Sequence, residues 1–166
     1  MFQAVRQRMA DMRTIKTLCE GAERHANADG HPAPGAEHFI LAALDLPDGT
    51  ARQAFLRAGA DPAQFRDAIT VQYRDALATA GMDPQALQDL DGPIAAQPGP
   101  YQARPSAGAL MQQLADRETR GALQALVGAD VVAAGAGAEH GVAARALRRM
   151  GVDRERLIAA ARAHAT

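Results

Sequence analysis

The sequence predicts an all-α fold built as a pseudo-twofold tandem repeat, in which two four-helix units pack into one domain. Three observations support this prediction. Apolar residues recur three or four positions apart, and no alternating stretch of β-branched or aromatic residues indicates a strand. Alanine, the strongest helix former, supplies 40 of the 166 residues. A segment near the end of the first half also recurs in the second half.

Four helices are predicted in the first half. The first should span about four turns, with one face formed by Met12, Ile15, Cys19, Ala22 and Ala26. The second begins near Glu37 and ends at the turn of residues 47–49, and the third ends at Gly59. The fourth follows Asp61, whose carboxylate is suited to capping a helix. Its predicted core face holds Phe65, Ile69, Tyr73 and Ala76.

A stretch rich in proline and glycine separates the two predicted units, residues 1–79 and 106–166. We interpret residues 80–105 as an extended linker, with a short helix at 84–90 after an aspartate-proline pair. Beyond it, Ser106 is predicted to cap a helix that turns Leu110 and Leu114 inward. Because each unit holds few large apolar residues, the two should bury one another and form one compact domain.

The internal repeat appears when the sequence is shifted by 92 positions. Residues 49–61 then lie over residues 141–153, with identical residues at six of the thirteen positions. Alanine richness inflates such a score, but it does not explain the matched glycines and aspartates. These are Gly49 with Gly141, Gly59 with Gly151, and Asp61 with Asp153. The glycines indicate turns, and the two aspartates are interpreted as helix caps.

Charge and composition argue against several classes of partner. The net charge of −1, without a run of one sign, disfavours nucleic acid as a partner. No segment approaches the ~20 apolar residues that span a membrane, and the first residues do not resemble a signal peptide. The single Cys19 cannot form an internal disulfide and is predicted to be a buried core residue. We therefore expect a cytoplasmic protein, monomeric or dimeric, without membrane contact.

These residues resemble the N-terminal double repeat of the Clp ATPases. The first half shows Gly35-Ala36-Glu37-His38 before an apolar helix, and the second ends in a similar helix pair from Gly141 through Gly151-Val152-Asp153. The resemblance implies a non-catalytic module that docks adaptors or substrate proteins. The phosphate-binding loop of the Clp motor is missing, since the only lysine, Lys16, lies inside a predicted helix. The expectation is therefore a free-standing domain without ATPase activity.

The resemblance also offers one interpretation of Glu37 and His38. In some members the acidic residue of this motif helps to bind phosphorylated arginine on substrates, and the second half has Ala129-Asp130 at the equivalent positions. We therefore list Glu37 and His38 as candidate residues for binding protein or phosphoarginine. Arg148 and Arg149 join them, either as a solvated helix face or as a contact for an acidic partner surface.

Other interpretations of the Glu37-His38 pair need no partner protein. Glu37 can stabilise the exposed amides of a helix start while His38 packs beside it. The pair can also belong to a metal-dependent hydrolase that uses His25, His31 and His38, although these lack the spacing of a helix-borne zinc site. A ligand-binding regulatory helical domain is a further alternative. The predicted function remains protein binding, with no catalytic residue, metal or cofactor, and the sequence does not name the partner.

Overall fold

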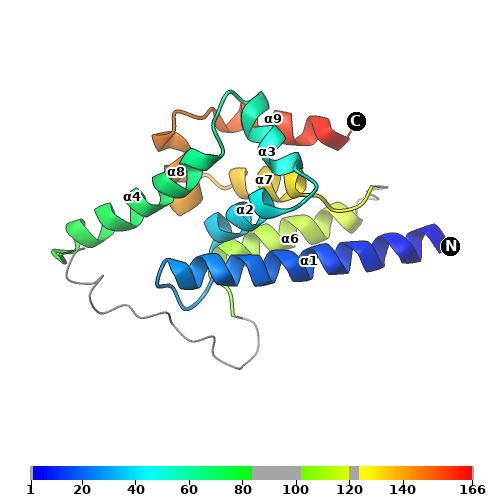
Figure 1. The fold of residues 1–166 in the computed structure, drawn as a ribbon, viewed down its shortest axis with the longest axis horizontal. Helices are drawn as coiled ribbons and strands as arrows, with labels where there is room; N and C mark the ends of the chain where they lie inside the picture. Colours follow the sequence, from blue (N-terminus) through cyan, green and yellow to red (C-terminus); the bar gives the residue numbers. More distant parts are fainter. Residues whose placement is uncertain (1, 84–101, 120–123, 166) are drawn as a thin grey trace.

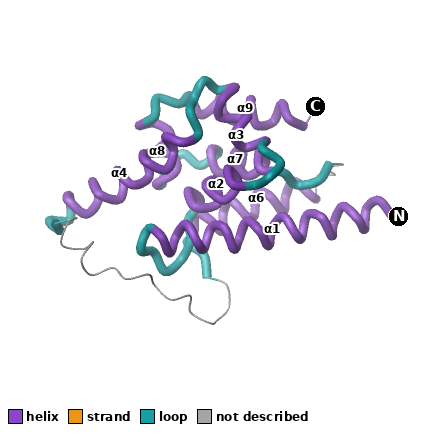
Figure 2. The backbone as a smooth tube through the Cα atoms, viewed as in Figure 1, coloured by secondary structure: helices purple, strands orange, loops and turns teal. Residues whose placement is uncertain are grey.

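The chain folds into helices throughout the part that a computed structural model describes, residues 2–83, 102–119 and 124–165 (Figures 1 and 2). Eight α-helices and a final 3₁₀ turn lie in these ranges, and none of the described residues forms a strand. In chain order they are α1 (Phe2–Ala28), α2 (Ala36–Asp45), α3 (Thr50–Arg57), α4 (Ala63–Thr79), α6 (Pro105–Thr119), α7 (Gly128–Ala136), α8 (Val142–Arg149), α9 (Arg154–Arg162) and η1 (Ala163–Ala165). The predicted all-α fold is confirmed.

The two halves interlock through their last helices. Helix α3 of the first half packs on α9 of the second, and α8 of the second half packs on α4 of the first. Helices α2 and α7 pack against each other between these two pairs. This exchange is the arrangement expected of a pseudo-twofold repeat, because each half completes the other's helix packing. The predicted boundaries at residues 79 and 106 stay a prediction, since residues 84–101, with the short helix expected at 84–90, lie outside the described residues.

One hydrophobic core runs through both halves. Its largest fully buried apolar side chains come from α1, α2, α3, α4, α6, α8 and α9: Leu18, Phe39, Ile40, Phe55, Phe65, Ile69, Leu110, Leu147 and Leu157. Burying such a side chain contributes roughly 1.5–3 kcal/mol. Glycine lets α7 approach this core closely, because a Cβ on Gly135 would lie 2.7 Å from Cδ1 of Ile40. The small second-half helix α7 therefore packs tightly although it lacks large leucines.

The same turn ends α3 and α8. Gly59 and Gly151 have φ angles of +80° and +69°, which glycine adopts without strain. After each glycine the next amide reaches back five residues, from Ala60 to the carbonyl of Phe55 and from Val152 to the carbonyl of Leu147. This is the Schellman geometry of a helix end. The repeat is therefore present in the backbone hydrogen bonding as well as in the amino-acid sequence.

The structure corrects three details of the predicted helices. Helix α1 begins at Phe2, well before the predicted four-turn segment, because no proline or glycine interrupts residues 2–20. Met12 is 70% exposed, and Leu18 instead supplies the buried leucine of this helix. Ala76 is exposed on α4, whereas Cys19 is partly buried and packs against the core. None of the described helices is long and apolar enough to cross a membrane.

Candidate functional site

Helix α2 begins with a closed ring of hydrogen bonds. Gly35 precedes the helix, and its amide donates to Nδ1 of His38, 2.9 Å away. Since Nδ1 is the acceptor, the hydrogen of a neutral ring is on Nε2, which donates to Oδ2 of Asp29 at 3.2 Å. His38 is fully buried. Its two nitrogens thus tie the start of α2 to the loop that follows α1.

Glu37 is buried and bound by two groups from distant parts of the chain. Its side chain is 2% exposed, and Oε1 accepts from the Tyr73 hydroxyl and from Nη1 of Arg104, the latter at 2.9 Å. The same Nη1 lies 2.9 Å from the Tyr73 oxygen. Burial and the hydrogen bond to Glu37 raise the pKa of Tyr73, so this phenol stays protonated. We call these three residues the Glu37 network.

Gly35 leaves the space that this carboxylate occupies. A Cβ on Gly35 would lie 2.6 Å from both Oε1 and Oε2 of Glu37, which is closer than real contacts allow. The backbone of Arg104 is held at the same place, because its amide donates to the carbonyl of Pro34 at 2.9 Å. The segment that leads into α6 is therefore fastened to the loop before α2 by both its backbone and its side chain.

A second chain of charges lies beside the Glu37 network. Nη1 of Arg66 donates to Asp29 at 2.8 Å, and Nη2 donates to Nδ1 of His25. Nε2 of His25 in turn donates to Asp45, 2.7 Å away. Burial lowers the pKa of His25, and the nearby Arg66 acts in the same direction. Although burial opposes it, the hydrogen bond from His38 and the charge of Arg66 lower the pKa of Asp29.

His31 packs among these groups as a neutral ring. Its centroid lies 4.2 Å from that of Tyr73 and 5.8 Å from that of His38. Burial lowers its pKa, and the positive charge of Arg104 adds to the effect. Its Nε2 is buried with no hydrogen-bond partner. The ring therefore contributes packing on Tyr73.

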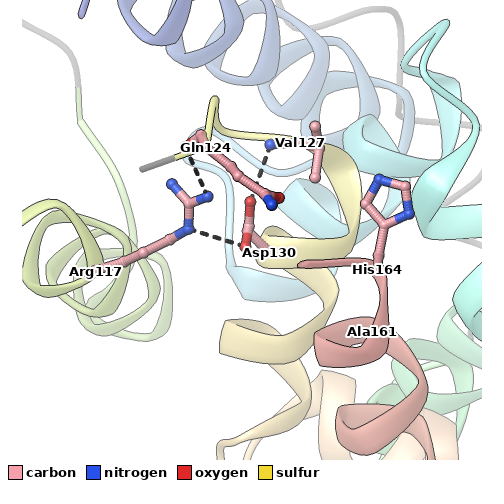
Figure 3. Close-up of a pocket in the computed structure, with 6 residues that line it drawn as sticks. All are labelled: Arg117, Gln124, Val127, Asp130, Ala161 and His164. Carbon is pink, nitrogen blue, oxygen red and sulfur yellow. Dashed lines mark hydrogen bonds and ion pairs between the residues drawn. The ribbon is translucent and has the colours of Figure 1, made fainter. Parts of the chain in front are cut away.

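The start of α7 uses the same backbone device with a different acid. Here Val127 precedes the helix, and its amide donates to Oδ2 of Asp130 at 3.0 Å, as the Gly35 amide does to His38. The other oxygen of Asp130 lies 3.0 Å from Nε of Arg117 on α6. Figure 3 shows this pair at the side of a small pocket that Gln124, Val127, Ala161 and His164 complete. The equivalent of Glu37 is Ala129, so this half lacks a buried carboxylate at that position.

The first amides of α7 are bound by the first half. The amide of Gly128 donates to Asp48 at 3.0 Å, and that of Ala129 donates to the Thr50 hydroxyl at 2.8 Å. In the reverse direction, the amide of Ala36 donates to the hydroxyl of Ser106 at 3.2 Å. Ser106 was predicted to cap its own helix and instead caps α2 from the other half. Because α6 starts one residue earlier, at Pro105, this serine already lies inside its helix.

The match to a protein-family model decides the family. Residues 13–125, more than half of the chain, match the Clp repeat N-terminal domain. The chain belongs to this family. A search of curated proteins found no match. Clp repeat domains are non-catalytic protein-interaction modules of Clp ATPases, so the resemblance stated from the sequence is confirmed.

The matched range covers the whole Glu37 network and ends before α7. The Clp repeat model thus includes the Gly35–His38 motif and the linker, but the second-half helix pair that resembles the family most closely lies beyond residue 125. That pair is linked to the matched part by the turns of α3 and α8, which share one hydrogen-bond pattern. The structure therefore supports the repeat where the sequence match stops.

The other predicted candidates, Arg148 and Arg149, lie on the exposed side of α8. Arg149 is 3.7 Å from Asp75 of α4, with both side chains more than half exposed. Arg148 donates weakly to carbonyl groups of Ala144 and Glu139, each at 3.4 Å. The contacts of Glu37 and His38 are with other residues, so no described interaction joins the two candidate pairs.

Two of the three histidines of the hydrolase alternative are engaged in hydrogen bonds. Both ring nitrogens of His25 and of His38 have partners in the protein, whereas Nε2 of His31 is buried without one. Within the described ranges, no three or more His, Cys, Asp or Glu side chains are grouped so that they could hold a metal ion. For the ligand-binding alternative, the described residues include a small pocket beside Asp130. The described histidines give the hydrolase alternative no support.

Sequence reasoning missed Arg104, Tyr73 and Asp29 as partners of the Glu37-His38 pair, and it missed Arg66 as the partner of Asp29. One signal was available: Tyr73 occupies an apolar position of its helix, and a buried tyrosine hydroxyl usually finds a polar partner. That reasoning points from Tyr73 to a buried acceptor such as Glu37. Arg104 gave no signal, because it lies at the end of a proline-rich stretch interpreted as a linker.

Proposed function

We propose that this Clp repeat domain is a non-catalytic docking platform, located in the cytoplasm, that receives adaptors or substrate proteins of the Clp protease system. Family membership over residues 13–125 is the observation that carries the proposal. The side chains of Glu37 and His38 are engaged in hydrogen bonds within the domain, which fits a non-catalytic role. Docking is proposed along the seam between the two halves, where α4 meets α8.

The charges along this seam favour an acidic partner surface. Arg145, Arg148 and Arg149 are exposed on α8, and two of them reach α4, through Gln72 at 3.3 Å and Asp75 at 3.7 Å. Exposed pairs of this kind contribute little to stability, so the guanidinium groups can exchange their partners for those of another protein. Arg148 and Arg149 are therefore the proposed contacts.

Affinity capture from a lysate of the source organism tests this proposal. We expect the wild-type domain to retain a Clp ATPase, an adaptor or degradation clients, and the double variant Arg148→Glu, Arg149→Glu to lose them. Arg162→Glu is the matched control, because Arg162 is also an exposed arginine of the second half but lies near the end of α9. Identical protein sets on the wild type and the double variant would contradict the seam as the docking site.

A phosphoarginine contact at Glu37 remains a separate prediction. Arg104 already places a guanidinium on this carboxylate, so a substrate guanidinium must displace it. The variant Arg104→Ala is therefore expected to bind a phosphoarginine peptide more tightly than the wild type, measured by calorimetry against the unphosphorylated peptide. Absence of binding to either protein would remove Glu37 from the list of docking residues without affecting the seam.

A further inference from the structure

The first turns of α1 carry an apolar stripe that faces away from the domain. Phe2, Val5, Met9 and Met12 are 88%, 53%, 57% and 70% exposed. Residues of a helix lie 100° apart, so these four share one side, roughly opposite the buried Leu18. In Figure 1 the N-terminal end of α1 projects at one end of the molecule. All four residues precede residue 13, where the family match begins.

The spacing of the stripe is that of a coiled-coil seam. Intervals of three and four residues place Phe2 and Met9 at heptad position a, and Val5 and Met12 at position d. The next a position is Lys16, which is exposed and ends the apolar run after about 15 Å. A stripe restricted to a and d positions is narrower than the broad apolar face of helices that lie in a membrane surface. Its shape therefore fits a second helix.

The charged residues beside the stripe indicate which charge a partner helix should carry. Arg6 and Arg13 both lie at position e, where side chains pair across a coiled coil. The only acidic residue before Met12 is Asp11, whose carboxylate accepts from the amide of Leu126 at 2.8 Å and so points to the domain. In an antiparallel pair of two copies the e positions would face one another, so arginine would meet arginine, and like charges disfavour that contact.

We propose that residues 2–12 of α1 are a docking strip for an acidic amphipathic helix of a partner protein. The a and d side chains supply the apolar contact, and Arg6 and Arg13 attract acidic residues at the partner's flanking positions. The strip is part of a helix that continues into the folded domain, so only the partner has to order itself on binding. This surface is distinct from the seam between α4 and α8 and does not depend on it.

Two designed peptides of about 20 residues test the proposal. Both have leucine and isoleucine at a and d; one has glutamate at e and g, and the other has lysine. In fluorescence anisotropy we expect the acidic peptide to bind the full chain, the basic peptide not to bind, and added salt to weaken the complex. Equal binding of both peptides, or binding of neither, would overturn the proposal.

Variants locate the binding on the strip. Val5→Ser with Met9→Ser should weaken the acidic peptide about tenfold or more, because two central anchors are lost. Leu56→Ser is the matched control, since Leu56 is also an exposed apolar residue, at 62%, but lies on α3. Arg6→Glu with Arg13→Glu should reverse the preference and favour the basic peptide. All positions are exposed, so thermal unfolding should match that of the wild type, and an unreversed preference would contradict the assigned charges.

Other occupants of the strip give other results. Self-association in sedimentation velocity that Val5→Ser with Met9→Ser abolishes would mean that a second copy covers the strip. Cosedimentation with phosphatidylserine-containing vesicles, lost in the same variant, in the absence of acidic-peptide binding would mean a membrane surface. Either result overturns the proposal, whereas the capture experiment with Arg148→Glu, Arg149→Glu reports separately on the seam.

Discussion

The N-terminal ends of α2 and α7 share one hydrogen-bond arrangement but lie in two different environments. In both, the residue before the helix donates its amide to the side chain of the third helical residue, His38 in α2 and Asp130 in α7. Around His38 the chain adds a buried acid, a tyrosine and an arginine from beyond the linker. Around Asp130 the described residues add Arg117, which is partly exposed. The repeat thus keeps one hydrogen-bond geometry, while the buried carboxylate among the described residues lies at the start of α2.

The two starts also depend on each other. Helix α7 has its first amides bound by Asp48 and Thr50, and α2 has one bound by Ser106. Each half therefore supplies acceptors that the other half's helix lacks. An exposed helix end finds such acceptors in water, so these bonds matter because the starts of α2 and α7 are buried between the two halves. The N-terminal ends of α2 and α7 are therefore part of the interface between the two halves.

Removing the acid at each start should give the largest difference between them. Glu37→Ala leaves the Tyr73 hydroxyl and the half-buried Arg104 without their acceptor, so we expect the free energy of unfolding to fall by about 3 kcal/mol. Asp130→Ala removes one cap and a partly exposed ion pair, and a loss of about 1 kcal/mol is expected. Urea unfolding followed by circular dichroism measures both. Equal losses would mean that the Glu37 network adds nothing beyond the shared cap.

The residue before each helix should differ next. Gly35→Ala places a methyl group 2.6 Å from the Glu37 carboxylate oxygens, and relieving this contact is expected to cost about 2 kcal/mol. Val127→Ala is the matched change in α7, where a side chain is already present, and we expect a loss below about 1 kcal/mol. In the double variant Gly35→Ala, Glu37→Ala the clash is gone, so its two effects should not add. Additive losses would contradict the crowding argument.

The sequence predicted most of the fold because the repeated turns carry strong local signals. Gly59, Gly151 and Asp153 each act within one helix end, so nearby residues suffice to place them. Asp61 lies one residue before Pro62, the N-cap of α4, and its carboxylate accepts from the amide of Ala63, the first residue of that helix. Periodicity also placed the apolar faces, except at Ala76 near the end of α4 and where α1 leaves the domain and Met12 meets solvent. The prediction was wrong there because periodicity reports an apolar face and not what covers it.

The site was less accessible to sequence reasoning because its contacts join distant residues. Glu37 and Arg104 are 67 positions apart, and the capping contact between Ser106 and Ala36 spans 70. Residues 102–104 precede α6 outside any helix, but nothing in the proline and glycine residues around them indicates that Arg104 folds back onto α2. Sequence-based interpretation therefore found the Glu37-His38 motif and missed what it binds.

Smaller effects are expected from the caps that cross between the halves. Thr50→Val leaves the buried Ala129 amide without an acceptor and should lower the free energy of unfolding by about 1.5 kcal/mol. Thr50→Ser keeps the hydroxyl and should recover most of this loss. Ser106→Ala removes the longer bond to Ala36, and about 0.5 kcal/mol is expected. If urea unfolding shows a larger loss for Ser106→Ala than for Thr50→Val, the cap on α2 contributes more stability than the cap on α7, which would contradict this prediction.

The smallest effect at neutral pH is expected for a change at His31, because this residue alters the free energy of unfolding only as the pH falls. Its folded-state pKa is lowered from 6.5, so below that pH the unfolded chain binds a proton that the folded ring does not bind. The free energy of unfolding should therefore fall as the pH drops from 7 through 6.5, and His25, whose pKa is lowered too, adds to the trend.

His31→Phe should weaken this decline, because phenylalanine keeps the packing on Tyr73 without titrating and Nε2 has no hydrogen bond to lose. His140→Phe, at an exposed turn of the second half, is the matched control and should leave the decline unchanged. Urea unfolding between pH 7 and pH 5 measures the slope. An unchanged slope in His31→Phe would assign the acid sensitivity to other groups, such as His25, whose pKa is also lowered.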